Sequence, residues 1–232
     1  MMTKWKQRHW LENGWVAFDG LLEGKSKERL SQWVAEVAMA PATAEGRQHH
    51  YETIAQAETL CRTENFLADH EALRTLVTGP LLTEVAAALL DDDAALTNGK
   101  INYKQPGGAG FAAHQDAARD PAAGRRVVCL IAVDPMTPKN GCLDFASGCH
   151  GRLLESDAEG CLLPRAAAKL SWEAVPLPVG GVVFFSPLAP HCSAPNASSW
   201  PRRALYLTYR AGGESRLRDP GYAHRAQAMA AL

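Results

Sequence analysis

The chain has 232 residues, of which 47% are hydrophobic and 21% charged, and its formal net charge is −1 at pH 7. This composition is ordinary for a soluble globular enzyme, and a chain of this length can form one large domain. No basic block or basic helix face stands out. The sequence therefore predicts no nucleic-acid partner and no binding to an anionic membrane.

The sequence also predicts a cytoplasmic protein without a membrane span. Its longest apolar run, residues 127–133, is far shorter than the roughly 18 residues that cross a bilayer. The first nine residues are polar and charged and lack the apolar core of a signal peptide. The six cysteines form no C-x-x-C pair, which favours reduced thiols in a reducing compartment.

Helical patterns prevail in the first 97 residues. After a short strand at residues 14–20, apolar residues at helical spacing predict helices at 26–39, 68–77 and 81–90, with residues 42–48 as a loop. Pro41 and the pair Gly79-Pro80 provide the stops.

The character of the chain changes after residue 97, where short β-like runs alternate with Gly, Pro and Asn turns. Strands are predicted at residues 99–104, 125–133, 142–146, 171–175, 181–185, 189–193 and 203–210. This pattern is typical of a β-sandwich or jelly roll. We expect one mainly β domain over residues 1–232: a mostly helical buttress (1–97), a β core (98–211) and a C-terminal tail (212–232).

A His-x-Asp motif, His114-Gln115-Asp116, provides the first two candidate metal ligands. In an extended strand alternate side chains share a face, so we expect His114 and Asp116 to point the same way and bind one ion. An imidazole with a carboxylate suits Fe(II), Mn(II) or Zn(II). The motif alone is weak, because such pairs arise by chance and two ligands do not complete a site.

His191 is the favoured third ligand, because it follows a buried strand-like run that turns at Pro187 and Pro190. The other histidines are assigned surface, cap or turn roles, without β context: His9, His49, His50, His70, His150 and His224. Two histidines and one carboxylate leave about three positions of an octahedral iron open, whereas a structural zinc prefers a closed site.

Arg202 and Arg203 begin the last predicted strand, and alternation sends them to opposite faces. Whichever side chain enters the apolar interior needs an anionic partner, because an unpaired buried guanidinium is very costly. A carboxylate held through two parallel hydrogen bonds meets that need. Both arginines could instead be solvated at the start of the strand.

These residues together resemble the phytanoyl-CoA dioxygenase (PhyH) family of Fe(II)/2-oxoglutarate oxygenases. The resemblance is carried by His114-Gln115-Asp116, His191 and Arg202, and it spans nearly the whole chain, from residue 14 to residue 209. Residues 141–150 are similar to the family's Gly-x-Leu…Gly-Ser-His segment, with Cys149 in place of the usual serine.

The resemblance implies a double-stranded β-helix (jelly-roll) core and the cofactors Fe(II), 2-oxoglutarate and O2. It implies that Arg202, eleven residues after the second histidine, binds the far carboxylate of 2-oxoglutarate. It also matches Ser193 and Asn102 to residues of the cofactor site. Halogenating relatives lack the carboxylate ligand, so the presence of Asp116 favours hydroxylation.

Residues 60–66 and 100–104 look like the 2-aminoethylphosphonate dioxygenase branch of this family, in which the carbon next to phosphorus is hydroxylated. The candidate contacts for a small anionic substrate are Arg62, Asn65, Lys104 and Arg119. Arg62 and Glu64 could instead form a surface ion pair of little energetic value. The alternative functions are hydroxylation of another small metabolite, a zinc hydrolase with the same ligands, and a jelly-roll protein that binds without turnover.

Overall fold

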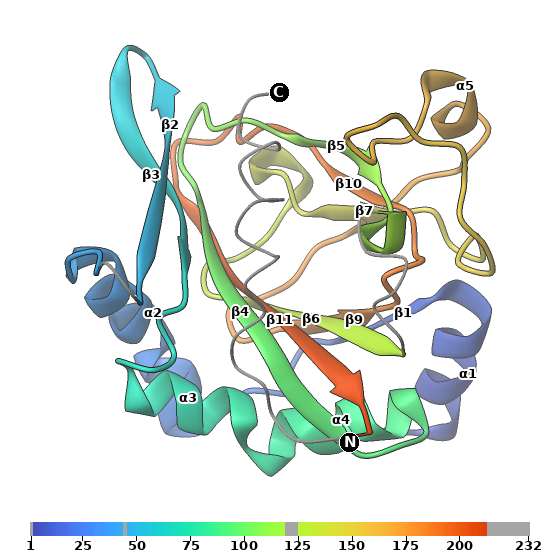
Figure 1. Ribbon diagram of the computed structural model, residues 1–232, viewed down its shortest axis with the longest axis horizontal. Coiled ribbons are helices and arrows are strands. Elements are labelled where there is room, and N and C mark those ends of the chain that lie inside the picture. Colours follow the sequence, from blue (N-terminus) through green and yellow to red (C-terminus); the bar gives the residue numbers. More distant parts are fainter. Residues whose placement is uncertain (1, 44–45, 119–124, 213–232) are drawn as a thin grey trace.

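The computed structural model describes residues 2–43, 46–118 and 125–212. Within these ranges two antiparallel sheets face each other (Figure 1), with strand orders β1-β9-β6-β11-β4-β3-β2 and β5-β10-β7-β8. The larger sheet contains β1 (Trp15–Phe18), β2 (Gln48–Ile54), β3 (Ala57–Glu64), β4 (Ala94–Lys104), β6 (Arg126–Ala132), β9 (Val182–Phe185) and β11 (Arg202–Ala211). The smaller sheet contains β5 (Phe111–His114), β7 (Leu143–Phe145), β8 (Glu173–Val175) and β10 (His191–Ser193).

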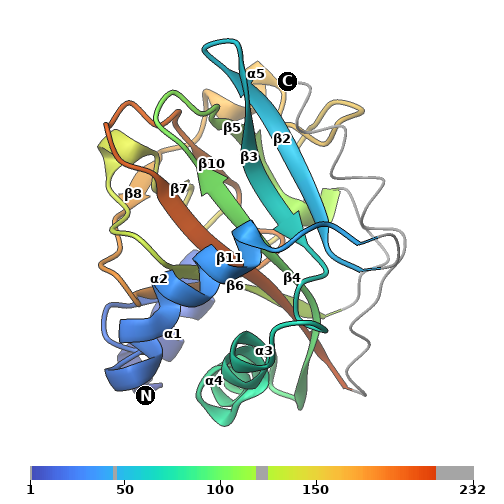
Figure 2. The ribbon, with the colours of Figure 1, turned by 90° about the vertical axis from the view of Figure 1, so that its left-hand side faces the viewer.

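Helices cover the outer face of the larger sheet, where Figure 2 shows α2, α3 and α4 on one side of it. The helical segments are α1 (Lys4–Asn13), α2 (Gly24–Met39), α3 (Glu71–Thr78), α4 (Pro80–Leu90), α5 (Pro164–Ala167) and the 3-10 turns η1 (Asp116–Ala118) and η2 (Pro138–Asn140). In α2 the apolar residues recur at helical spacing, and Leu30, Trp33, Val34 and Val37 are all buried against this face.

Strand alternation gives the larger sheet two different faces. On β11, Leu205, Leu207 and Tyr209 are fully buried in the core shared with the helices. Residues of opposite parity, such as Arg202 and Ala204, face the smaller sheet, where Ala204 packs in a second apolar cluster with residues of β7, β8 and β9. The space between the sheets is therefore bounded by rigid, paired backbone on both sides.

The helices and strands predicted from the sequence are present, with boundaries shifted by a few residues. Several elements were missed, among them α1, the short helix α5 and the hairpin β2–β3. The loop expected at residues 42–48 overlaps the hairpin only at Gln48, where β2 begins. The prediction that His49 and His50 lack β context was wrong, because both lie on β2. The hairpin turn, Ala55-Gln56, has φ of 48° and 69°, a backbone usually signalled by Gly or Asn.

The expected division at residue 98 does not separate helices from strands, because β1, β2 and β3 precede it and belong to the larger sheet. The tail expected over residues 212–232 lies, except for Gly212, outside the described residues. All six cysteines are free thiols.

One stretch, Glu71–Leu90, is long and apolar enough to cross a membrane by length and composition alone. It comprises α3 and α4, which are separated at Gly79. Several of its apolar side chains, among them Leu73, Val77 and Leu82, are fully buried in the core under the larger sheet. Packing in that core accounts for its composition.

A substitution at Gly141 tests how closely the backbone packs against Ala194 and Lys104. This glycine has φ of 73°, and a Cβ there would overlap the carbonyl oxygen of Ala194 and lie 2.9 Å from Lys104 Nζ. We expect Gly141→Ala to lower the free energy of unfolding by roughly 1–3 kcal/mol, measured by urea denaturation. Gly151→Ala is the control, because nothing lies within 4 Å of its added Cβ. Equal stability of the two variants would contradict this packing.

Candidate active site

Two imidazoles meet where β5 pairs with β10. His114 ends β5, His191 begins β10, and the two residues are direct partners in the antiparallel register, with ring centroids 4.2 Å apart. The Nδ1 atoms lie 2.7 Å from the carbonyl oxygen of Ala112 (His114) and 3.0 Å from that of Ala189 (His191). Because a carbonyl only accepts, both Nδ1 atoms carry the proton, which leaves each Nε2 available as a metal ligand.

Asp116 is the third candidate ligand, and its backbone conformation differs from the prediction. His114 and Asp116 were expected on one extended strand, but β5 ends at His114 and Asp116 opens the 3-10 turn η1. The turn still brings its carboxylate to the imidazole, with Oδ1 3.6 Å from His114 Nε2. The ligand atoms of His114, Asp116 and His191 all lie within 4.8 Å of one another, close enough for one ion to contact all three.

The turn depends on Gln115, a residue to which the sequence analysis gave no role. Its side chain is fully buried, and its amide donates to the carbonyl oxygens of Arg152 (2.9 Å) and Leu188 (2.5 Å). Its Oε1 accepts from the backbone N–H of Leu154 at 2.7 Å. Gln115 therefore points away from the metal ligands and fixes the backbone between them.

The electrostatics keep Asp116 and His191 in metal-binding forms. Burial opposes ionisation of Asp116, but His114, His191 and Lys100 favour it and hold the pKa of Asp116 below its ordinary value. Burial, together with the charge of His114, lowers the pKa of His191 to about 4. An ionised Asp116 and a neutral His191 are the forms that coordinate a divalent cation.

Lys100, which the sequence analysis did not single out, also bears on this site. It lies on β4, and its ammonium stands over the ring of Tyr206, 5.4 Å from the centroid. Its positive charge contributes to lowering the pKa values of both Asp116 and His191, so it lies near the metal ligands.

Arg202 enters the space between the sheets and is completely buried. Its Nη1 lies 3.5 Å from Tyr206 Oη, whereas its Nε and Nη2 have no hydrogen-bond partner among the described residues. A buried guanidinium with unpaired N–H groups is costly unless an anion completes it. The residues present thus fit a carboxylate ligand at this position.

Arg203 points to the opposite face, as alternation predicts. It makes a two-pronged contact with Asp134, from Nε at 2.8 Å and from Nη2 at 2.7 Å, and Nη2 also donates to Ser31 Oγ at 2.9 Å. Its charge is therefore matched within the protein, unlike that of Arg202. The alternative that both arginines are solvated at the start of the strand is excluded.

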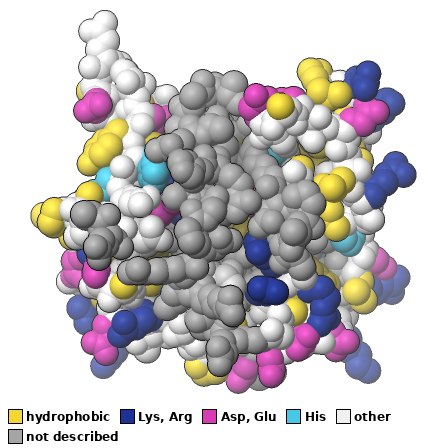
Figure 3. Space-filling model, in the orientation of Figure 1, with side chains coloured by type: hydrophobic (Ala, Val, Ile, Leu, Met, Phe, Trp, Pro, Cys, Tyr) yellow, Lys and Arg dark blue, Asp and Glu magenta, His cyan; other side chains and the backbone are white. Residues whose placement is uncertain are grey.

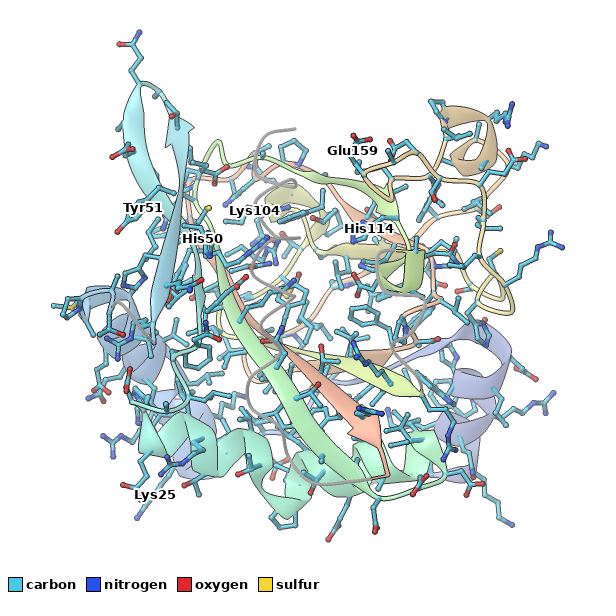
Figure 4. The ribbon with its side chains drawn as sticks, in the orientation of Figure 1. Lys25, His50, Tyr51, Lys104, His114 and Glu159 are labelled. Carbon is cyan, nitrogen blue, oxygen red and sulfur yellow. The ribbon has the colours of Figure 1, made fainter. Side chains whose placement is uncertain are left out.

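Lys104 and Ser193 lie beside Arg202. The β4–β11 register sets Lys104 directly opposite Arg202, and Lys104 Nζ donates to Ser193 Oγ (2.7 Å) and to the carbonyl oxygen of Ala194 (2.6 Å). Burial and the adjacent charge of Arg202 lower the pKa of Lys104 to about 7. An anion placed against both side chains would favour their charged forms. In the view of Figure 4, Lys104 lies between His50 and His114.

Arg62 and Asn102 form a second polar contact on the same face of the sheet. They are direct partners in the β3–β4 register, and Arg62 Nε donates to Asn102 Oδ1 at 3.2 Å. Arg62 Nη1 also lies 3.6 Å from Glu64 Oε1. Because Arg62 is 7% exposed and Glu64 3%, their pair is buried and is not a surface ion pair.

Of the other two predicted substrate residues, Asn65 is not part of this cluster. Asn65 follows β3 in an exposed bend, where its φ of 55° suits an asparagine in a turn. Arg119 lies outside the described residues. On the face drawn in Figure 3, acidic side chains lie mainly near the edge, whereas basic side chains lie both near the edge and in the lower middle of the view.

The sequence resembles those of known proteins. Residues 10–204 match the family described as Phytanoyl-CoA dioxygenase (PhyH). Over 222 residues, covering 95% of this chain and 85% of the relative, the sequence is 41% identical to a methylphosphonate hydroxylase of Gimesia maris. It is 32% identical to a 2-aminoethylphosphonate dioxygenase of an uncultured bacterium, HF130_AEPn_1, covering 93% of this chain and 85% of that one.

A solved structure supports the fold. EctD from S. alaskensis, crystallised with 2-oxoglutarate and 5-hydroxyectoine, superimposes with a TM-score of 0.80 at 20% identity, covering 90% of this chain and 76% of that chain. The predicted jelly-roll fold, mainly β with flanking helices, is thereby confirmed.

A His-Asp-His face beside a buried, anion-seeking arginine, between the sheets of a jelly roll, defines a non-haem Fe(II)/2-oxoglutarate-dependent dioxygenase. The chain belongs to the phytanoyl-CoA dioxygenase (PhyH) family. The predicted enzyme class and the predicted cofactors, Fe(II), 2-oxoglutarate and O2, are confirmed at the level of the family.

Removing the carboxylate tests the metal site directly. We expect Asp116→Ala to weaken Fe(II) binding at least about tenfold and to abolish turnover, because two neutral imidazoles remain to hold a dication. Anaerobic equilibrium dialysis measures the binding without relying on activity. His70→Asn is the control, because His70 caps α3 away from the site and asparagine keeps that role. Unchanged iron affinity in Asp116→Ala would contradict the assignment.

Proposed function

We propose that this dioxygenase hydroxylates the carbon next to phosphorus in a small organophosphonate. The names of its two relatives support this substrate class, and so do the cations that face the space between the sheets. The observation that carries the 2-oxoglutarate chemistry is Arg202: a fully buried guanidinium, short of partners in the described part of the chain, close to a metal-binding face.

In this proposal His114, Asp116 and His191 hold the iron. When bound, iron supplies with O2 and 2-oxoglutarate the oxidising power that converts a substrate C–H into C–OH, while 2-oxoglutarate becomes succinate and CO2. The protein's own contribution is to orient the reactants and to restrict the access of water. Phe145 and Phe185 pack against the ring of His191, with centroids 5.9 Å and 4.8 Å away, and keep that side of the site apolar.

We assign the far carboxylate of 2-oxoglutarate to Arg202, with Ser193 beside it. We also assign Lys104, expected from the sequence as a substrate contact, to this group, because its ammonium donates to Ser193 and its residue pairs with Arg202. The substrate phosphonate is then assigned to Arg62, with Asn102 between the two groups and Lys100 toward the metal ligands. The site thus offers two anion positions, one for each organic reactant.

The zinc hydrolase and the non-catalytic binding protein use the same three side chains but make different predictions. A hydrolase has no need of O2, ascorbate or 2-oxoglutarate, and a binding protein produces no succinate. Both readings are tested in the experiment that tests the substrate.

Anaerobic addition of Fe(II) and 2-oxoglutarate to metal-free protein should produce a visible metal-to-ligand charge-transfer band. Admission of O2 with methylphosphonate or 2-aminoethylphosphonate should then give equal amounts of succinate and hydroxylated phosphonate, followed by phosphorus-31 NMR. If the band and succinate appear without any hydroxylated phosphonate, the proposed oxygenase activity stands and the proposed substrate class is rejected. The absence of a band would reject the oxygenase.

Arg202→Ala should raise the Kd of 2-oxoglutarate by at least about thirtyfold, because a charge-assisted, two-pronged hydrogen bond to its far carboxylate is lost. The charge-transfer band measures this binding. Arg203→Ala is the matched control: it breaks the contact with Asp134 on the other face and should change this Kd less than about threefold. The reverse result would mean that the wrong arginine has been assigned.

A further inference from the structure

Glu64 is the one acidic side chain of the β2–β3 hairpin that is buried within the described residues, and neither the metal site nor the assigned 2-oxoglutarate site uses it. It ends β3 and is 3% exposed. Its Oε1 accepts no hydrogen bond from any described residue. A buried carboxylate oxygen without a donor is costly, so this position calls for an N–H or O–H group.

The neighbouring basic groups do not supply that donor. Arg62 Nη1 lies 3.6 Å from Glu64 Oε1, and His50 Nε2 lies 3.9 Å from Oε2, both beyond hydrogen-bond distance. Burial lowers the pKa of His50, which favours its neutral form, and its Nε2 likewise has no partner in the described part of the chain. The carboxylate is therefore held in place by nearby charge but is not satisfied by it.

Lys100 is the direct partner of Glu64 in the β3–β4 register. Its ammonium lies over the ring of Tyr206 and acts on the metal ligands, as described above. The Lys100 ammonium thus lies toward β11, which carries Tyr206, and Glu64 Oε1 receives no hydrogen bond from it.

The position of Glu64 relative to the assigned phosphonate site defines the ligand it could take. Arg62 and Glu64 are alternate residues of β3 and share a face, with Cα atoms about 6.5 Å apart in an extended strand. Arg62 Nη1 lies 3.6 Å from Glu64 Oε1, so one small ligand with an anionic and a cationic end can contact both side chains. A small zwitterion with a phosphonate at one end and an ammonium at the other matches this pair of charges.

We propose that Glu64 is a specificity-determining residue that accepts a hydrogen bond from an ammonium group on the substrate. The chain then prefers an aminoalkylphosphonate to a phosphonate of the same size without a donor. The inference rests on the proposed function and adds to it which phosphonates the site selects.

The test compares 2-aminoethylphosphonate with propylphosphonate, in which a methyl group replaces the ammonium. In the wild-type protein kcat/KM should be higher for the amine. Glu64→Gln should lower the ratio of the two kcat/KM values roughly ten- to a hundredfold, as expected for loss of a buried charge-assisted hydrogen bond. Glu58→Gln, an exposed carboxylate on the same strand, is the control and should leave the ratio unchanged.

A second measurement needs no turnover. Anaerobic binding of each phosphonate to protein loaded with Fe(II) and 2-oxoglutarate can be followed from the change it causes in the charge-transfer band. Wild-type protein should bind the amine at least about tenfold more tightly than propylphosphonate, a result that does not require the variant to fold.

The outcomes separate the two proposals. If wild-type protein hydroxylates phosphonates but shows no preference for the amine, or if Glu64→Gln lowers both kcat/KM values equally, Glu64 is not a specificity residue and the proposed function stands. If no phosphonate is hydroxylated, the proposed function fails and the inference fails with it. A preference for methylphosphonate that Glu64→Gln leaves unchanged overturns the inference alone.

Discussion

The antiparallel pairing of β5 with β10 is the constraint on which the site depends. Backbone pairing sets His114 directly beside His191, although 77 residues separate them in the chain. Each imidazole donates a hydrogen bond to the backbone carbonyl two residues earlier, and this local contact orients the ring. The third ligand, Asp116, is positioned differently, because the strand ends before it. The buried side-chain amide of Gln115 holds the backbone turn that brings the Asp116 carboxylate close to His114.

The larger sheet gives this metal face its charged surroundings. One of its faces packs on helices and is apolar, whereas the other places Arg62, Asn102, Lys104 and Arg202 between the sheets. In an extended strand this division requires only that polar and apolar residues alternate. A shift of one residue on β11 would exchange Arg202 with Arg203 and bury a guanidinium whose partner, Asp134, is on the other side.

These relations explain how much the sequence could predict. Residue types and their strand-like surroundings marked His114, Asp116 and His191 as candidates, and strand alternation set Arg202 and Arg203 on opposite faces. The choice of Arg202 came from the family resemblance. The short strands after residue 97 were identifiable because glycine, proline and asparagine mark their turns. The hairpin β2–β3 was not, since Ala55-Gln56 adopts positive φ without a glycine or asparagine to signal it.

The consequence for the site was larger than for the fold. Missing β2 and β3 meant that His50 and Glu64 could not be placed beside Arg62. Gln115 was overlooked for another reason: its role depends on backbone groups of Arg152, Leu154 and Leu188, and contacts that distant leave no local pattern.

The charges between the sheets also link ligand binding to stability. Arg202 and Lys104 face each other across paired strands with no carboxylate bonded to either among the described side chains, and their mutual repulsion contributes to the lowered pKa of Lys104. An anion that binds there removes an unfavourable interaction of the folded protein as well as forming new hydrogen bonds. Because only the folded chain holds the two cations together, such an anion must stabilise the fold in proportion to its affinity. The repulsion between these like charges thus favours the binding of an anion at this position.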